Sequence, residues 1–114
     1  MNNLKNRVQL IGRLGSNPEM KTMENGNKLA KMNLATHDVY TNNQGERVED
    51  TEWHNVIAWG KTAEIAEKYL QKGSEVMVEG KLTYREYTAK DGAKRTVTEI
   101  VVNSLMMMDK KQVA

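Results

Sequence analysis

The sequence predicts an all-β domain: a five-stranded Greek-key barrel with one helix between the third and fourth strands. Its 114 residues provide for one domain with one hydrophobic core. Five segments are rich in apolar residues or alternate apolar with polar side chains, as strands do, and a single segment changes to helical spacing. Turns that contain glycine and asparagine separate these segments. The resulting order, three strands, a helix and two strands, is typical of a small Greek-key barrel.

The first three strands precede the helix. Residues 7–14 form the first strand, which ends at a Gly-Ser-Asn-Pro turn. Residues 28–40 form the second, in which Lys31 and Asn33 point away from the face that carries the apolar side chains. Residues 48–59 form the third strand, which follows a polar loop and ends before a glycine.

The helix and two further strands complete the domain. Residues 61–72 form the helix, and Gly73 is placed to adopt the left-handed conformation just past its end. The helix positions expected to form its apolar stripe are Thr62, Ile65, Ala66, Tyr69 and Leu70. Residues 75–87 and 96–105 form the last two strands, joined by a hairpin loop with an Asp-Gly turn.

Four of the six aromatic residues are predicted to face outward. Trp53 and Trp59 lie on one face of the third strand, and the small apolar residues that suit a barrel interior lie on the other. Tyr87 lies on the polar face of the fourth strand, and Tyr40 lies where the second strand enters a polar loop. The competing interpretation buries the two tryptophans, since large aromatic side chains are usually well buried. The remaining two aromatics are predicted to be core residues: Tyr69 and Tyr84.

Basic side chains near the outward aromatics favour nucleic acid as a ligand. An aromatic ring can stack on an unpaired base, and lysine or arginine neutralises the phosphates. Arg85 shares a strand face with Tyr87, while Lys61 and Lys72 flank the helix and Arg7 opens the first strand. The formal net charge of only +2 would not by itself indicate nucleic acid. The prediction therefore depends on where the charges are placed.

Several function classes are not supported by the sequence. There is no cysteine, and His37 and His54 are too far apart to suggest a metal site. The serines have no local histidine partner, and the glycines match neither a phosphate-binding loop nor a dinucleotide fingerprint. No apolar run is long enough to span a bilayer, and the first residues do not resemble a secretory signal. We therefore expect no catalysis, no cofactor, no metal and no membrane, in a cytoplasmic protein.

Three stretches resemble the bacterial single-stranded DNA-binding protein (SSB) family. They are residues 8–19 (VQLIGRLGSNPE), residues 51–64 (TEWHNVIAWGKTAE) and residues 69–82 (YLQKGSEVMVEGKL). The resemblance implies an OB-fold, an oligonucleotide-binding Greek-key barrel, assembled as a homotetramer. It further implies sequence-independent binding and protection of single-stranded DNA in replication, recombination and repair, in a nucleoid-associated protein.

The resemblance also implies roles for individual residues. By this resemblance, the stacking aromatics of the family correspond to Tyr40, Trp53, Trp59 and Tyr87. The basic residues of the family that contact DNA correspond to Arg7, Lys61, Lys72 and Arg85. The histidine after the central tryptophan corresponds to His54, which suits a structural position at or near a subunit interface.

The end of the chain departs from the family pattern. We expect a DNA-binding domain over residues 1–107 and a short tail over residues 108–114. This tail is basic, whereas relatives usually end in an acidic tip that recruits replication and repair proteins, so recruitment of such partners is left open. Two alternative functions also stay open: a protein-interaction module that reuses the barrel, and RNA binding, since stacking accepts any base.

Overall fold

The computed structural model describes residues 5–108 and confirms the predicted OB-fold barrel with its single helix. The elements, in chain order, are β1 (Val8–Leu14), β2 (Glu19–Thr22), β3 (Lys28–Thr41), β4 (Arg47–Trp59), α1 (Gly60–Tyr69), β5 (Glu75–Thr88) and β6 (Lys94–Met107). The five long strands are the five that the sequence predicts. The short strand β2 is an addition, and it forms a hairpin with the beginning of β3. Apart from residue 108, the expected C-terminal tail lies outside the described residues.

The barrel closes because β1 pairs with two strands. It runs antiparallel to β5 along most of its length and then pairs with β3 through Arg13 and Leu14. Gly12 lies at this crossing, where an added β-carbon would collide with the backbone carbonyl of Ala35. On the opposite side β4 and β6 pair in parallel, at Val56 with Ile100 and at Ile57 with Val101. Glycine at position 12 therefore allows the close strand approach that the closed sheet requires.

The core fills the barrel and the space under the helix. The side chains that are almost fully buried include Leu34, Val56, Val76 and Val78. Helix α1 packs on this core through Ala63 and Ala66, and Leu70 follows directly after the helix. These small side chains let the helix lie close to the barrel, so that it covers one end of the core.

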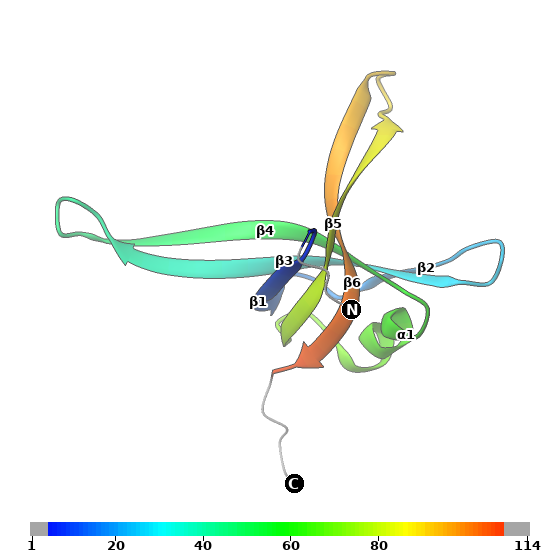
Figure 1. Cartoon of the computed structure of the whole chain (residues 1–114), viewed down its shortest axis with the longest axis horizontal. Helices are drawn as coiled ribbons and strands as arrows, with labels where there is room; N and C mark the ends of the chain where they lie inside the picture. Colours follow the sequence, from blue (N-terminus) through cyan, green and yellow to red (C-terminus); the bar gives the residue numbers. More distant parts are fainter. Residues whose placement is uncertain (1–4, 109–114) are drawn as a thin grey trace, which may run out of the picture.

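Two long hairpins project from the barrel in different directions (Figure 1). We call them the β3–β4 arm, residues 37–52, and the β5–β6 arm, residues 83–97. Both arms, and the β2–β3 hairpin, end in a five-residue loop whose fourth residue is a glycine with positive φ: Gly26, Gly45 and Gly92. Each loop is closed by the same two backbone hydrogen bonds, as in a type I turn followed by a left-handed glycine. Nearly all arm side chains are exposed, since no further layer covers them.

The two tyrosines predicted to be core residues are exposed, so that prediction is wrong. Tyr69 shares an exposed stripe of α1 with Ile65, whereas the buried stripe runs through Ala63 and Ala66. Lys68 Nζ lies 5.6 Å from the centre of the Tyr69 ring. Tyr84 follows the core residues of β5 by strand parity, but it lies on the β5–β6 arm, beyond the end of the core.

The predicted helix end is also displaced. Helix α1 ends at Tyr69, and Gly73, with a φ of +90°, belongs to the turn that follows rather than to the helix terminus. Gly73 and Ser74 in this turn donate backbone hydrogen bonds to Leu14 and Gln71. The glycine thus ties the turn after the helix to the end of β1. Among residues 5–108, no helix is long and apolar enough to cross a membrane.

Candidate nucleic-acid interface

Strand β4 turns its tryptophans outward, as strand parity predicts. Trp53 is 61% exposed and Trp59 is 42% exposed, whereas Val56 and Ala58 on the opposite face are fully buried. The competing interpretation, in which both indoles pack in the core, is therefore wrong. His54 lies on the inner face, half-buried, with its Nε2 2.9 Å from Thr36 Oγ1. This contact accounts for the histidine as a structural residue of the β3–β4 pair.

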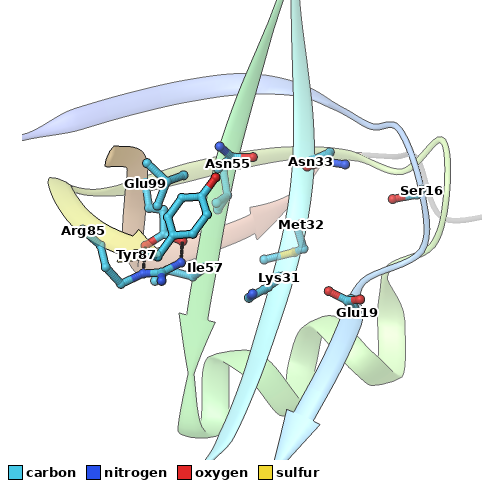
Figure 2. Close-up of a pocket in the computed structure, with 12 residues that line it drawn as sticks. Ser16, Glu19, Lys31, Met32, Asn33, Asn55, Ile57, Arg85, Tyr87 and Glu99 are labelled. Atoms are coloured by element: carbon cyan, nitrogen blue, oxygen red, sulfur yellow. Dashed lines mark hydrogen bonds and ion pairs between the residues drawn. The ribbon is translucent and has the colours of Figure 1, made fainter. Parts of the chain in front are cut away.

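A groove runs between β3–β4 and the base of the β5–β6 arm. We call it the central groove; its walls include Lys31, Asn33, Asn55, Ile57, Arg85 and Tyr87, and Glu99 lies at its floor. Figure 2 shows the Tyr87 ring beside the Arg85–Glu99 pair, with Lys31 on strand β3. Apolar, aromatic, amide and cationic groups therefore line one open channel, together with the carboxylates of Glu19 and Glu99. The first four kinds are the groups that contact bases and phosphates of an unpaired strand.

A second groove continues the central one toward Trp59. This side groove shares Lys31, Ile57, Arg85 and Glu99 with the central groove. Its further walls include Lys21, Met23, Leu29, Trp59 and Tyr84. The two grooves therefore form a continuous path, in which Tyr87 lines the central groove and Trp59 lines the side groove. A strand lying along this path would pass both rings.

Arg85 is fixed at the junction of the two grooves by Glu99. Arg85 Nη2 lies 3.0 Å from Glu99 Oε2, and Arg85 Nε lies 3.3 Å from Glu99 Oε1. The hydrogen bond and then the charge of Glu99 raise the pKa of the Arg85 guanidinium. The Glu99 side chain is only 7% exposed, whereas that of Arg85 is 52% exposed. Arg85 thus stays charged, is held in one orientation, and presents its open side to the groove.

Trp53 lies against the backbone at Gly15 and is otherwise largely exposed. Its six-membered ring lies against Gly15, where an added β-carbon would overlap the ring atoms. The indole is nevertheless 61% exposed, so most of its surface is open to the solvent. A ring that rests on backbone and leaves its remaining surface open can accept a stacked base without a change of conformation.

The other predicted site residues lie outside the two grooves. Tyr40 is exposed on the β3–β4 arm, opposite Val48. Arg7 is paired with Glu79, at 2.6 Å between Nη2 and Oε2. Lys61 and Lys72 are exposed at the two ends of the helix region, and the Lys72 backbone donates a hydrogen bond to Asn17. The structure thus brings Trp59, Tyr87 and Arg85 to one path and leaves these four residues around it.

The prediction missed several groove residues. Lys31 and Asn33 point outward by strand parity, and this signal was available from the sequence. Lys21 lies on β2, which the sequence did not predict, and Tyr84 was assigned to the core. Across the part of the chain that the structure describes, no three histidine, aspartate or glutamate side chains gather as ligands for a metal ion.

Comparisons with known proteins agree with this geometry. The model of the Single-strand binding protein family matches residues 5–108. A single-stranded DNA-binding protein of Neisseria meningitidis serogroup A is 46% identical over 103 residues, which are 90% of this chain and 59% of that protein. One of Xanthomonas campestris pv. campestris is 43% identical over 103 residues, again 90% of this chain and 60% of that protein. The chain thus spans about three fifths of the length of these relatives.

Two solved structures share the fold. A structure of the Plasmodium falciparum SSB in complex with single-stranded DNA superposes with a TM-score of 0.85 and 31% identity, covering 96% of this chain and all of that one. A crystal structure of a deletion mutant of the single-stranded DNA binding protein from Thermus aquaticus gives a TM-score of 0.79 and 33% identity. That match covers 91% of this chain and 50% of the Thermus chain.

Proposed function

The chain belongs to the single-strand binding protein family, and from that premise we propose that it binds single-stranded DNA without sequence preference and catalyses no reaction. One observation carries the proposal. Trp59 and Tyr87, both exposed aromatics, line one continuous path of two grooves that also contains the cations Lys31 and Arg85. Stacking on the rings and neutralisation of phosphates are the two interactions that hold an unpaired strand.

The residues of the path suit binding that ignores sequence. Every base has a flat face, so stacking on Trp59 and Tyr87 does not select among bases. Asn33 and Asn55 carry both donors and acceptors in their amides, which suit the edges of all four bases. The open, elongated shape of the path admits a strand from either end, which a closed pocket would not.

We assign the same function to the other predicted residues. Trp53 and Tyr40 would stack further bases, and Arg7, Lys61 and Lys72 would attract the backbone where it leaves the path. Their exposure and their positions on several sides of the barrel support a strand that bends around the protein. Tyr40 would contribute least, because its arm carries five carboxylates and only one arginine.

We further propose a homotetramer that protects single strands during replication, recombination and repair, in the cytoplasm with the nucleoid. An apolar line crosses the outer side of β1, β5 and β6, where the exposed Ile11 is paired with the half-buried Met77 and Met77 with the exposed Met106. Such a line suits contact between copies, because exposed contiguous apolar surface is typical of interaction sites. Recruitment of replication and repair proteins stays open, as do the alternative functions of RNA binding and of a protein-interaction module.

A titration with oligo-dT tests the binding proposal. Because two tryptophans are exposed, we expect their emission to fall on binding and the affinity to decrease as salt rises. Unchanged emission and no binding of a labelled oligonucleotide at micromolar protein would contradict the proposal. An oligo-U competitor that displaces oligo-dT at equal concentration would identify RNA as an equivalent ligand. Sedimentation with and without poly-dT measures the number of subunits and whether long strands wrap around them.

A further inference from the structure

Tyr84 lies beyond the end of the core, where its aromatic ring is left open to the solvent. At 69% exposed it is the most exposed large hydrophobic side chain among residues 5–108. Large aromatics usually bury most of their surface, and an exposed one at the edge of a groove is typical of a binding site. Its position on the arm explains why the ring is not in the core, and its place at a groove suggests what the ring could bind.

Its surroundings are those of a base-binding site. Tyr84 lines the side groove together with Trp59, and the groove also contains apolar side chains from Met23, Leu29 and Ile57. Three cations lie on its walls: Lys21, Lys31 and Arg85. Within the described chain neither lysine forms an ion pair, so both ammonium groups are available to an anion. Apolar surface, two aromatic residues and free cations together match a flat, uncharged ring with an attached phosphate.

The backbone on both sides of Tyr84 is held in place. The side-chain amide of Asn6 donates a hydrogen bond to the carbonyl of Leu82 and accepts one from the Leu82 N–H, both at 2.9 Å. Thr83 Oγ1 donates to the carbonyl of Glu99 at 3.2 Å, and Arg85 is bound to the Glu99 carboxylate. Tyr84 thus extends from an anchored backbone segment, so the backbone needs no further ordering when the ring takes up a ligand.

We propose that the side groove is a further nucleotide-binding subsite, in which Tyr84 stacks on a base next to the one held by Trp59. The proposal rests on single-stranded DNA binding as the function and extends the set of stacking residues by one. Lys21 and Lys31 would hold the phosphate of the same nucleotide. The strand would then continue from Tyr87 past Arg85 to Trp59 and Tyr84.

Removal of the ring tests the subsite. We expect Tyr84→Ala to bind oligo-dT roughly five- to 150-fold more weakly, the value of one stacked base. Tyr84→Phe keeps the ring and should bind within about twofold of the unmodified chain. Tyr69→Ala is the matched control, because this tyrosine is also more than half exposed but lies on α1, outside both grooves. It should leave the affinity unchanged.

A fluorescent reporter provides a direct second measurement. In a chain with Trp53→Phe and Trp59→Phe, the substitution Tyr84→Trp makes position 84 the sole tryptophan. Quenching of this emission by oligo-dT would support the subsite, and unchanged emission at saturation would overturn it. Equal affinity of Tyr84→Ala and the unmodified chain would also overturn it, with DNA binding itself intact. If the unmodified chain binds no oligonucleotide, the proposed function itself is wrong, and this outcome is distinct from a failure of the Tyr84 subsite alone.

Discussion

The β3–β4 arm and the β5–β6 arm have the same backbone loop and opposite charge. In both loops a backbone pair closes the five residues, Asn42 to Glu46 in one and Ala89 to Ala93 in the other. Residues 37–52 carry five carboxylates and one arginine, a formal charge of −4 with histidine neutral. Residues 83–97 carry four basic and two acidic side chains, a formal charge of +2. The loop residues set the shape of an arm, and the strand residues set which ligand it attracts.

The acidic arm contains electrostatic repulsion of its own. Asp38 and Asp50 are directly opposite in the strand register, a like-charge pair that destabilises a sheet. His37 lies beside them, with its Nε2 3.0 Å from Glu49 Oε1 and its Nδ1 3.1 Å from Thr51 Oγ1. We expect a DNA strand to contact the basic arm closely and the acidic arm weakly. Four pairs of substitutions test the comparison of the two arms.

The largest combined effect, on stability and on binding together, is expected at Arg85 in the basic arm. Arg85→Ala leaves the buried carboxylate of Glu99 without its partner, which we expect to lower the free energy of unfolding by about 1–2 kcal/mol. It also removes the cation at the junction of the two grooves, so affinity for oligo-dT should fall. Urea unfolding and an oligo-dT titration measure the two effects. Arg95→Ala is the control, because its pair with Asp91 is exposed and contributes little. Equal effects of the two variants would contradict this account.

The two arm tyrosines compare the arms directly. Tyr87→Ala should weaken oligo-dT binding by about 1–3 kcal/mol, since the ring lies in the central groove beside Arg85. Tyr40→Ala should cost less, because phosphates approaching this ring meet the acidic arm. Titrations of both variants at low salt give the ranking. A larger loss for Tyr40 would show that the arm charges do not decide which arm binds DNA.

The shared loop geometry predicts equal stability effects in the two arms. Gly45 and Gly92 have φ values of +79° and +85°, which cost an L-residue about 1 kcal/mol. Gly45→Ala and Gly92→Ala should therefore lower the free energy of unfolding by similar amounts, as measured by thermal or urea unfolding. Clearly unequal losses would mean that the two loops differ in more than the charge of their strands.

The smallest effects are expected from single surface charges. Asp50→Asn should stabilise the protein by roughly 0.2–1 kcal/mol, because it removes the like-charge pair with Asp38. It should also raise oligo-dT affinity slightly. Lys94→Gln on the basic arm should lower the affinity and reduce the slope of log affinity against log salt, by up to about 0.7 if Lys94 contacts one phosphate. Salt titrations of both variants measure this, and a decrease in affinity for Asp50→Asn would refute the assignment.

The sequence predicts the fold well where strands with one apolar and one polar face surround a single core. On β4 the alternation of large and small side chains correctly orients Trp53 and Trp59, because one strand face must be buried in a closed barrel. The same reasoning fails at Tyr84 and Tyr69. Parity assigns a side chain to a face, but it does not tell whether another element covers that face. Tyr84 lies beyond the core and Tyr69 on an uncovered stripe of the helix.

The Arg85–Glu99 pair could not be predicted from the sequence. The two residues are 14 positions apart on neighbouring strands, and their contact depends on the register of β5 against β6. From the loop at residues 89–93 to Gly80 this register is regular, so the length of the loop sets it. A shift of one residue reverses which side chains share a face, and the Asp-Gly turn signal alone does not give the loop length.

If Trp53 stacks on a base as proposed, Gly15 would influence binding without touching the ligand. The Trp53 ring occupies the space that a β-carbon at position 15 would need. Even the methyl group of alanine there would therefore displace the indole. Gly15→Ala would change the angle at which Trp53 meets a base while every surface side chain stays the same. An alanine scan confined to side chains in contact with DNA would therefore overlook Gly15, which contributes because it has no side chain.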